Sequence, residues 1–214
     1  QTDPIGNNSD VNLYAYTFND GVNRYDPEGT DALWVMDIAK TQPGGNAQLV
    51  IPVHFVGRGA TDEFVAAVTA RAAQLRTPIS NLSVRIVPTD KPIQGVLNTM
   101  DISPGNDYEN YEKGEGVNRF GGDRGHINSE LQDAVGAALH DALHFAGAPE
   151  GYEEIGGTAR QRGQSIPIEG YAESDIMASR AGTNLTQKDI SDIKRNQTTK
   201  VCKSVTGTRI LSCE

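Results

Sequence analysis

The sequence is short of positive charge and has no long apolar segment. It holds 19 Lys and Arg residues against 28 Asp and Glu residues, so its formal net charge is −9 over 214 residues. This balance disfavours general nucleic-acid binding, because a phosphate backbone attracts a basic surface. No apolar run reaches the roughly 18 residues that a membrane-spanning helix needs, and no signal-peptide pattern opens the chain. Because the sequence begins at Gln1, we expect it to be a piece of a longer protein.

Cysteine is also scarce, but its two occurrences lie close together, at Cys202 and Cys213. β-prone residues flank both, and the Thr-Gly-Thr segment between them favours a turn. A hairpin centred on Gly207 and Thr208 would place the two cysteines opposite each other, where a disulfide can form. Two free thiols in a reducing compartment are the alternative. A disulfide here would indicate a protein that works outside the cytoplasm.

The first 29 residues differ in composition from the rest of the chain. They are rich in Asn, Asp, Gly, Pro and Tyr, with turn signals every few residues. The motif DPIG at 3–6 returns as DPEG at 26–29, and VNLYAY between them alternates as a short strand. Such a segment cannot bury a core by itself. The remaining chain has the 37% hydrophobic, 22% charged background of a globular domain, so we expect two units, 1–29 and 30–214.

The segment 1–29 resembles the C-terminal end of the RHS-repeat core, which carries the same DPIG, NLYAY and DPxG motifs. In that family the core forms a β-cage around a variable toxin and releases it by self-cleavage after the second DPxG. The resemblance implies that Asp3 and Asp26 are the autocleavage carboxylates. It also implies a secreted effector domain after residue 29, with the RHS cage and a cognate immunity protein as partners. From the residues alone, the two aspartates fit turn-starting positions equally well.

Apolar periodicity in the second unit predicts strands that alternate with helices. Alternate residues from Leu49 to Phe55 are apolar, as expected of a strand. A capping box of Ser129 and Gln132 would begin the main helix, and Gly147 would end it. The expected strands are 46–57, 82–88 and 95–102, and the expected helices are 61–75, 127–147 and one capped by 186–189. This order predicts an α+β domain with a mixed sheet.

The main helix carries the residues that suggest chemistry. From Ala134 onward it is apolar except for His140, Asp141 and His144, so the helix should be buried. Histidines four residues apart lie on one face, where both can bind a tetrahedral Zn²⁺. After the helix, Glu150 can supply a third ligand and leave the fourth position for water. A hydrogen-bonded pair of core histidines is the alternative.

The stretch HDALHFAGAPE, from His140 to Glu150, and the downstream SDIMAS and LTQKDI motifs resemble the metzincin-like zinc metallopeptidases. That family has the pattern HExxHxxGxx(H/D), followed by a methionine turn. The resemblance implies a zincin-like fold with a mixed sheet, a long active-site helix and a C-terminal helix, here behind an RHS-core tail of strands and turns. It implies that His140, His144 and Glu150 bind zinc and that Met177 forms the methionine turn. A plain core methionine fits Met177 as well.

Other acids and two tyrosines complete the candidate site. Glu153 and Glu154 are alternative third ligands. Tyr152 and Tyr171 are candidates to stabilise an oxyanion, although tyrosines at the edge of solvent fit the sequence too.

Asp141 stands where the family has the glutamate that takes the proton from the attacking water. Aspartate is one methylene shorter, which withdraws the carboxylate by roughly 1.5 Å. Misplacement on this scale can cost on the order of 100-fold in rate. Three interpretations follow: a shifted site in which Asp141 is the base, an attenuated natural or engineered variant, or a base supplied by Glu153, Glu169 or Glu173.

These patterns together predict a secreted zinc metalloendopeptidase that is delivered into a target cell and hydrolyses a protein there. Two alternatives remain. A metal-dependent nuclease toxin would require Mg²⁺ and a basic groove, which the acidic chain disfavours. A non-catalytic binding domain on a zincin scaffold would bind zinc without cleaving a substrate.

Overall fold

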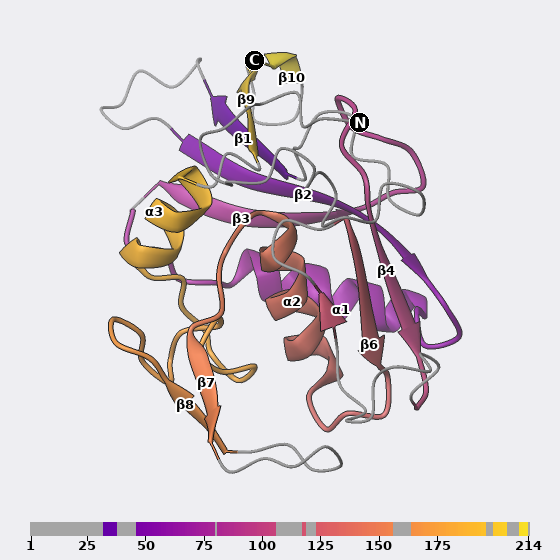
Figure 1. Cartoon of the computed structure of the whole chain (residues 1–214). Coiled ribbons are helices and arrows are strands. Elements are labelled where there is room, and N and C mark those ends of the chain that lie inside the picture. The colour runs from indigo at the N-terminus through magenta and orange to yellow at the C-terminus, as the bar shows by residue number, and fades with distance from the viewer. Residues whose placement is uncertain are drawn as a thin grey trace, which may run out of the picture.

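The structure, a computed structural model, describes residues 32–37, 46–79, 81–105, 117–118, 123–155, 164–195, 199–204 and 210–213. The expected unit 1–29, with Asp3 and Asp26, lies outside these residues. In the part that is described, the chain forms a mixed sheet and three helices (Figure 1). The α+β prediction is therefore confirmed.

The main sheet has the strand order β10-β9-β1-β2-β4-β6-β5, and β3 also pairs with β2. The pairs of β2 with β3, β2 with β4, β4 with β6 and β1 with β9 are parallel, and the remaining pairs are antiparallel. The strands of this sheet are β1 (Ala32–Asp37), β2 (Asn46–Val56), β3 (Leu82–Pro88), β4 (Asn98–Ser103), β5 (Val117–Asn118), β6 (Arg124–Asn128), β9 (Thr199–Ser204) and β10 (Ile210–Cys213). A separate antiparallel hairpin joins β7 (Tyr152–Ile155) to β8 (Gln164–Pro167).

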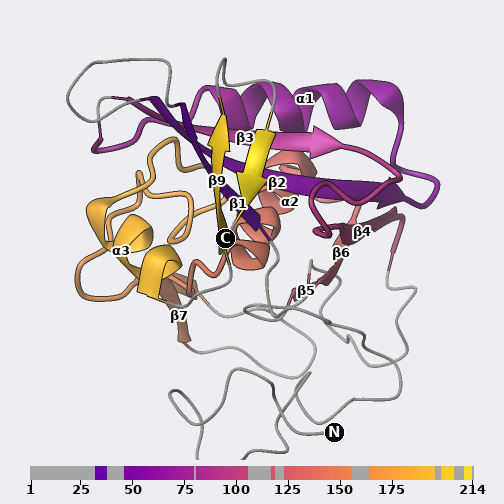
Figure 2. The ribbon, with the colours of Figure 1, turned by 90° about the horizontal axis from the view of Figure 1, so that it is seen from above.

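The helices α1 (Asp62–Ala73) and α2 (Ala134–Phe145) pack side by side against one face of the sheet (Figures 1 and 2). Leu49, Ile51 and Val53 of β2 join the large core beneath these helices. Val50 points to the opposite face, where it packs in a smaller cluster with Leu33 of β1. On this second face Val50 and Pro52 are buried, whereas Gln48 and His54 are half-buried.

The main helix begins later than the sequence analysis expected. Residues 124–128 form β6, and α2 starts at Ala134 with Asp133 as its N-cap. The Asp133 carboxylate accepts a hydrogen bond from the Gly136 amide at 2.8 Å. It also forms an ion pair with the Arg71 guanidinium at 2.7 Å. The expected capping box at Ser129 was therefore wrong, because pairing of β6 with β4 and β5 holds the preceding residues in the sheet.

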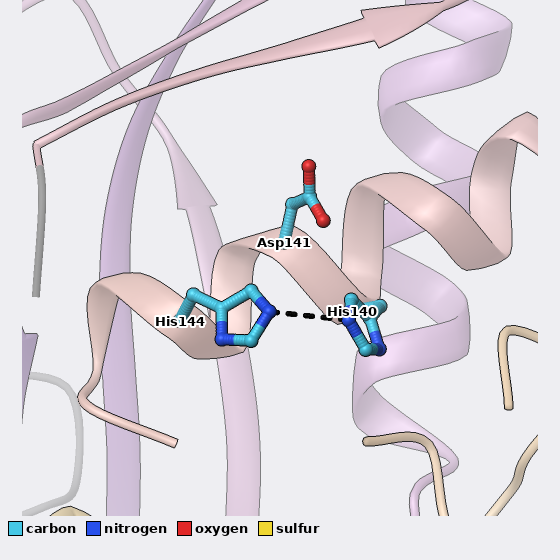
Figure 3. A group of neighbouring side chains, drawn as sticks. All are labelled: His140, Asp141 and His144. Atoms are coloured by element: carbon cyan, nitrogen blue, oxygen red, sulfur yellow. Dashed lines mark hydrogen bonds between the residues drawn. The ribbon is translucent and has the colours of Figure 1, made fainter. Parts of the chain in front are cut away.

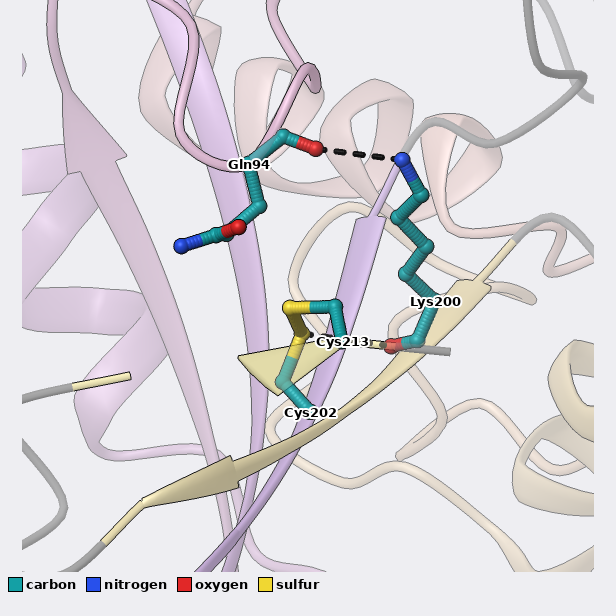
Figure 4. Close-up of a disulfide and its surroundings, with 4 residues drawn as sticks. All are labelled: Gln94, Lys200, Cys202 and Cys213. Carbon is teal, nitrogen blue, oxygen red and sulfur yellow. Dashed lines mark hydrogen bonds between the residues drawn. A yellow bond between two sulfur atoms is a disulfide. The ribbon is translucent and has the colours of Figure 1, made fainter. Parts of the chain in front are cut away.

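The C-terminal strands form the expected hairpin at one edge of the sheet. Cys202 of β9 stands opposite Cys213 of β10, and a disulfide joins them (Figure 4). Beside it, the ammonium group of Lys200 donates a hydrogen bond to the Gln94 carbonyl at 3.1 Å. The disulfide links the two strands of the hairpin, and β9 joins this hairpin to the rest of the sheet by pairing parallel to β1.

The last helix, α3 (Gln187–Arg195), begins at a capping box. The Asp189 carboxylate accepts hydrogen bonds from the Thr186 amide at 2.7 Å and from the Thr186 hydroxyl at 2.8 Å, while the Asp189 amide donates to that hydroxyl. The helix start expected at 186–189 is thus confirmed. None of the helices in the described part of the chain is long and apolar enough to cross a bilayer.

The start of α2 generates the first testable prediction, for Gly136→Ala. A Cβ at Gly136 would lie 2.3 Å from the Arg180 carbonyl oxygen and 2.4 Å from the Asp133 carboxylate. Helix propensity alone favours alanine by about 1 kcal/mol, but overpacking here should instead lower the free energy of unfolding by about 1–3 kcal/mol. Urea denaturation gives the sign directly, and stabilisation by alanine would contradict this account of the helix start.

Candidate metal centre

The helix α2 places three polar side chains in a dry interior. His140, Asp141 and His144 are 5%, 6% and 3% exposed, and the rest of α2 is largely buried and apolar. One ligand-type atom from each of the three lies within 4.8 Å of the others, so this group could hold a metal ion (Figure 3). Groups as polar as these are costly to bury unless they find partners.

Backbone carbonyls fix the tautomer of both imidazoles. The His140 Nδ1 lies 2.8 Å from the Ile176 carbonyl oxygen, and the His144 Nδ1 lies 2.7 Å from the Ala148 carbonyl oxygen. A carbonyl oxygen only accepts, so each Nδ1 carries the proton and donates it. Each neutral ring therefore presents a bare Nε2 lone pair to the other, which is the arrangement typical of metal-binding histidines.

Glu150 closes the site from the segment after α2. Its Oε2 lies 3.2 Å from the His140 Nε2, its Oε1 lies 3.2 Å from the His144 Nε2, and the two Nε2 atoms are 3.1 Å apart. Ligands at about 2.0–2.1 Å from a tetrahedral ion are separated from each other by roughly 3.3 Å. The three side chains thus fit three corners of such a tetrahedron. The Glu150 side chain is 48% exposed, which leaves this side of the site open.

Three acceptor groups that converge without a donor repel one another. A proton on His144 relieves part of this repulsion. Burial disfavours the charged form of His144, but the hydrogen bond and the negative charge of Glu150 have the larger effect and raise the pKa of His144. Burial would raise the pKa of Glu150, but its contacts with His140 and His144 lower it to about 2. A divalent cation would satisfy all three ligands at once.

Asp141 is next to this triangle of ligands. Burial raises its pKa to about 6, and the nearby His140 and His144 oppose that shift. The carboxylate points to a different side of α2 from the two rings (Figure 3). One of its oxygens lies within 4.8 Å of a nitrogen of each histidine, and Asp141 is outside the set formed by His140, His144 and Glu150.

A tight turn after α2 brings Glu150 back to the histidines. Gly147 has a φ of +89°, a conformation that glycine adopts without strain. The Gly147 amide donates to the His144 carbonyl, and the Ala148 amide donates to the Leu143 carbonyl. The same turn aims the Ala148 carbonyl at His144. Gly147 therefore positions both Glu150 and the carbonyl that orients His144.

The turn at residues 175–178, which we call the Met177 turn, forms the second support of the site. Met177 is fully buried, its amide donates to the Asp175 carboxylate at 2.8 Å, and its carbonyl accepts from the Gly151 amide at 2.9 Å. The Ile176 carbonyl between them is the acceptor for His140. The turn therefore touches the site through its backbone and lies where the sequence pattern predicted a methionine turn.

The two tyrosines have different surroundings. The Tyr152 ring lies 6.0 Å from the His140 ring, centre to centre, beside the ligands. The Tyr171 hydroxyl is buried, and burial together with the charges of Asp189, Asp192 and Asp175 raises its pKa above the ordinary value. Because this hydroxyl faces the acids around α3, we assign it to that cluster and retain only Tyr152 as an oxyanion candidate.

The alternative acids lie elsewhere. Glu153, on β7, is exposed, and Glu169 and Glu173 are exposed in the loop before the Met177 turn. The side chain of Glu154 lies outside the described residues. Glu150 is thus the acid that the described structure brings to both histidines. Sequence patterns missed the Ile176 and Ala148 carbonyls, because backbone acceptors leave no residue-type signal.

Comparison of the chain with protein-family models, with curated proteins and with solved structures finds no match in any of the three. The chemistry of the site is therefore inferred from its geometry.

The ligand geometry predicts one metal ion per chain. Replacement of His140 or His144 by alanine, or of Glu150 by glutamine, should weaken binding by more than the roughly 10–100-fold that loss of an outer contact costs. Titration against a chelator of known affinity measures this change. Glu153→Gln is the matched control and should leave affinity unchanged. Equal affinities for the Glu150 and Glu153 variants would exclude Glu150 as a ligand.

Proposed function

We propose that residues 30–214 form a zinc-dependent metalloendopeptidase, weakened by Asp141, that acts as the effector of a secreted RHS-type protein. The convergence of the His140 and His144 Nε2 atoms and the Glu150 carboxylate on one point carries this proposal. Two imidazoles and one carboxylate favour zinc, because Mg²⁺ and Ca²⁺ prefer ligand sets made of oxygen alone. The same ligand set and the net charge of −9 weigh against a nuclease.

Each residue of the site has a part in peptide hydrolysis. His140, His144 and Glu150 would hold the ion, which when bound would polarise the scissile carbonyl and acidify the attacking water. Asp141, within 4.8 Å of the histidine nitrogens, would accept the proton of that water and pass it to the leaving amine. The Tyr152 hydroxyl would donate a hydrogen bond to the oxygen that becomes negative. The exposed side of Glu150 provides the open face for a substrate protein.

The setting in a target cell comes from the resemblance of residues 1–29 to the end of an RHS core. A peptidase domain behind such a segment would be released by cleavage near Asp26 and delivered into another cell. An immunity protein in the producing cell would then be its natural partner. The disulfide between Cys202 and Cys213 supports a route through an oxidising compartment.

Asp141→Glu is the variant that tests this function most directly. The longer side chain should bring the carboxylate to the water and raise the hydrolysis rate on the order of 100-fold, whereas Asp141→Asn should remove the activity. The assay is hydrolysis of a casein-type substrate by the parent and both variants at equal zinc content. Zinc content and urea denaturation establish that each variant is folded and loaded. Should the loaded Asp141→Glu variant stay inactive, the domain is a zinc-binding module without catalysis.

Tyr152→Phe tests the second catalytic role on the Asp141→Glu background. Loss of one donor to the oxyanion should lower kcat by about 100-fold or more, with little change in KM. Zinc affinity should be unchanged, because Tyr152 is outside the ligand set. The matched control, Tyr171→Phe, should keep its kcat within a small factor. Equal losses of kcat in the two variants would contradict the assignment of Tyr152.

A further inference from the structure

Behind the Met177 turn, three polar side chains bury oxygens that point away from solvent. Asp175 and Asp189 are both fully buried. Among the described residues, no partner at normal hydrogen-bond geometry meets the Asp175 Oδ2, the Asp189 Oδ1 or the Tyr171 hydroxyl. The other oxygen of each carboxylate is satisfied: Asp175 Oδ1 by the Met177 amide and Asp189 Oδ2 by Thr186. Each acid therefore turns one free oxygen inward.

The Ile176 amide donates a hydrogen bond to the Asn184 carbonyl just before α3, which brings Asp175 towards the start of that helix, and no ion pair among the described residues includes Asp175 or Asp189. Burial and then the charge of Asp189 raise the pKa of Asp175 to about 7. The charged side chains on α3 are engaged elsewhere: Asp192 accepts from Lys188 at 3.0 Å and pairs with Arg195. The Lys188 ammonium also lies 4.9 Å from the centre of the Tyr171 ring. Two buried like charges at this place would repel strongly, whereas one proton between them removes the repulsion and fills both vacant acceptors.

We propose that Asp175 and Asp189 share one proton, and that this hydrogen bond holds the Met177 turn against α3 and so positions the Ile176 carbonyl that orients His140. The path is short and continuous. Asp175 Oδ1 holds the Met177 amide, and the adjacent Ile176 carbonyl accepts from the His140 Nδ1. Asp175 is therefore a positioning residue for the metal centre, and the start of α3 is its anchor.

A shared proton gives the fold a defined dependence on pH. The unfolded chain releases this proton at about pH 4. The folded protein still holds it at higher pH. The pair therefore stabilises the fold fully below about pH 4, and this contribution is lost as pH rises towards 7. In that interval the folding equilibrium constant should fall by up to about tenfold per pH unit.

Asparagine at position 175 or 189 distinguishes a pair of acids that share one proton from two acids that titrate independently. In Asp175→Asn, the amide oxygen can still accept from Met177, and the NH₂ group donates to Asp189 as the proton does. We expect Asp175→Asn to match the parent near pH 4 and to exceed its folding constant at pH 8 by at least about tenfold. Asp189→Asn should behave in the same way. In the double variant two NH₂ groups meet, and neither has an acceptor in the other. The double variant should therefore be less stable than either single variant.

The measurement is urea denaturation of the full chain from pH 4 to pH 8 in the presence of a chelator. Subtraction of the variant curve from the parent curve removes the contributions of Asp141, His144 and Glu150. Parallel curves for the parent and Asp175→Asn, or a double variant as stable as the single ones, would overturn the proposal.

A second readout tests the positioning role, and this part alone rests on the proposed zinc site. At pH 8, Asp175→Asn should bind zinc at least as tightly as the parent, and Asp175→Ala about 10–100-fold more weakly. Equal zinc affinity in the asparagine and alanine variants would overturn the positioning role. Because the unfolding experiment needs no metal, failure of the peptidase proposal and failure of the shared proton give different results.

Discussion

Convergence of two buried imidazoles and one half-exposed carboxylate beside α2 is the constraint on which the rest of the structure depends. The Nε2 atoms of His140 and His144 and the carboxylate of Glu150 lie 3.1–3.2 Å apart. Neutral imidazoles held by backbone carbonyls cannot supply a donor to this space. A positive charge, either a proton or a metal ion, would remove the repulsion between these acceptors.

The elements around α2 hold His140, His144 and Glu150 in this arrangement. The sheet and α1 bury the apolar sides of α2, so its register is fixed by packing. Gly147 reverses the chain within a few residues and returns Glu150 to the histidines. The Met177 turn supplies the carbonyl that orients His140. Ligands from one helix are thus oriented by backbone from two later segments, which gives the site its rigidity.

Sequence patterns predicted the parts of the fold whose signal is local. The alternation in β2 and the capping box at Thr186 correspond to observed elements. The start of α2 was mistaken, because Ser129 carries a valid local signal that β6 overrides by pairing with β4. The parallel pairing of β1 with β9 joins residues more than 160 positions apart, and no local pattern reports it. The approach of Glu150 to His140 and His144 was predictable because their spacing is a property of one helix and one turn; the carbonyls that orient the two histidines were not.

Buried acids around the site show how function and stability can be linked in one cluster. Asp141 is 6% exposed and burial raises its pKa to about 6, so in the proposed peptidase this burial would oppose the charge that a general base requires. Asp175 and Asp189 face the same conflict one layer further out, where a proton can be shared because no substrate has to reach it. An acid that must exchange protons needs access to a reacting group, whereas an acid that only positions the backbone can keep its proton.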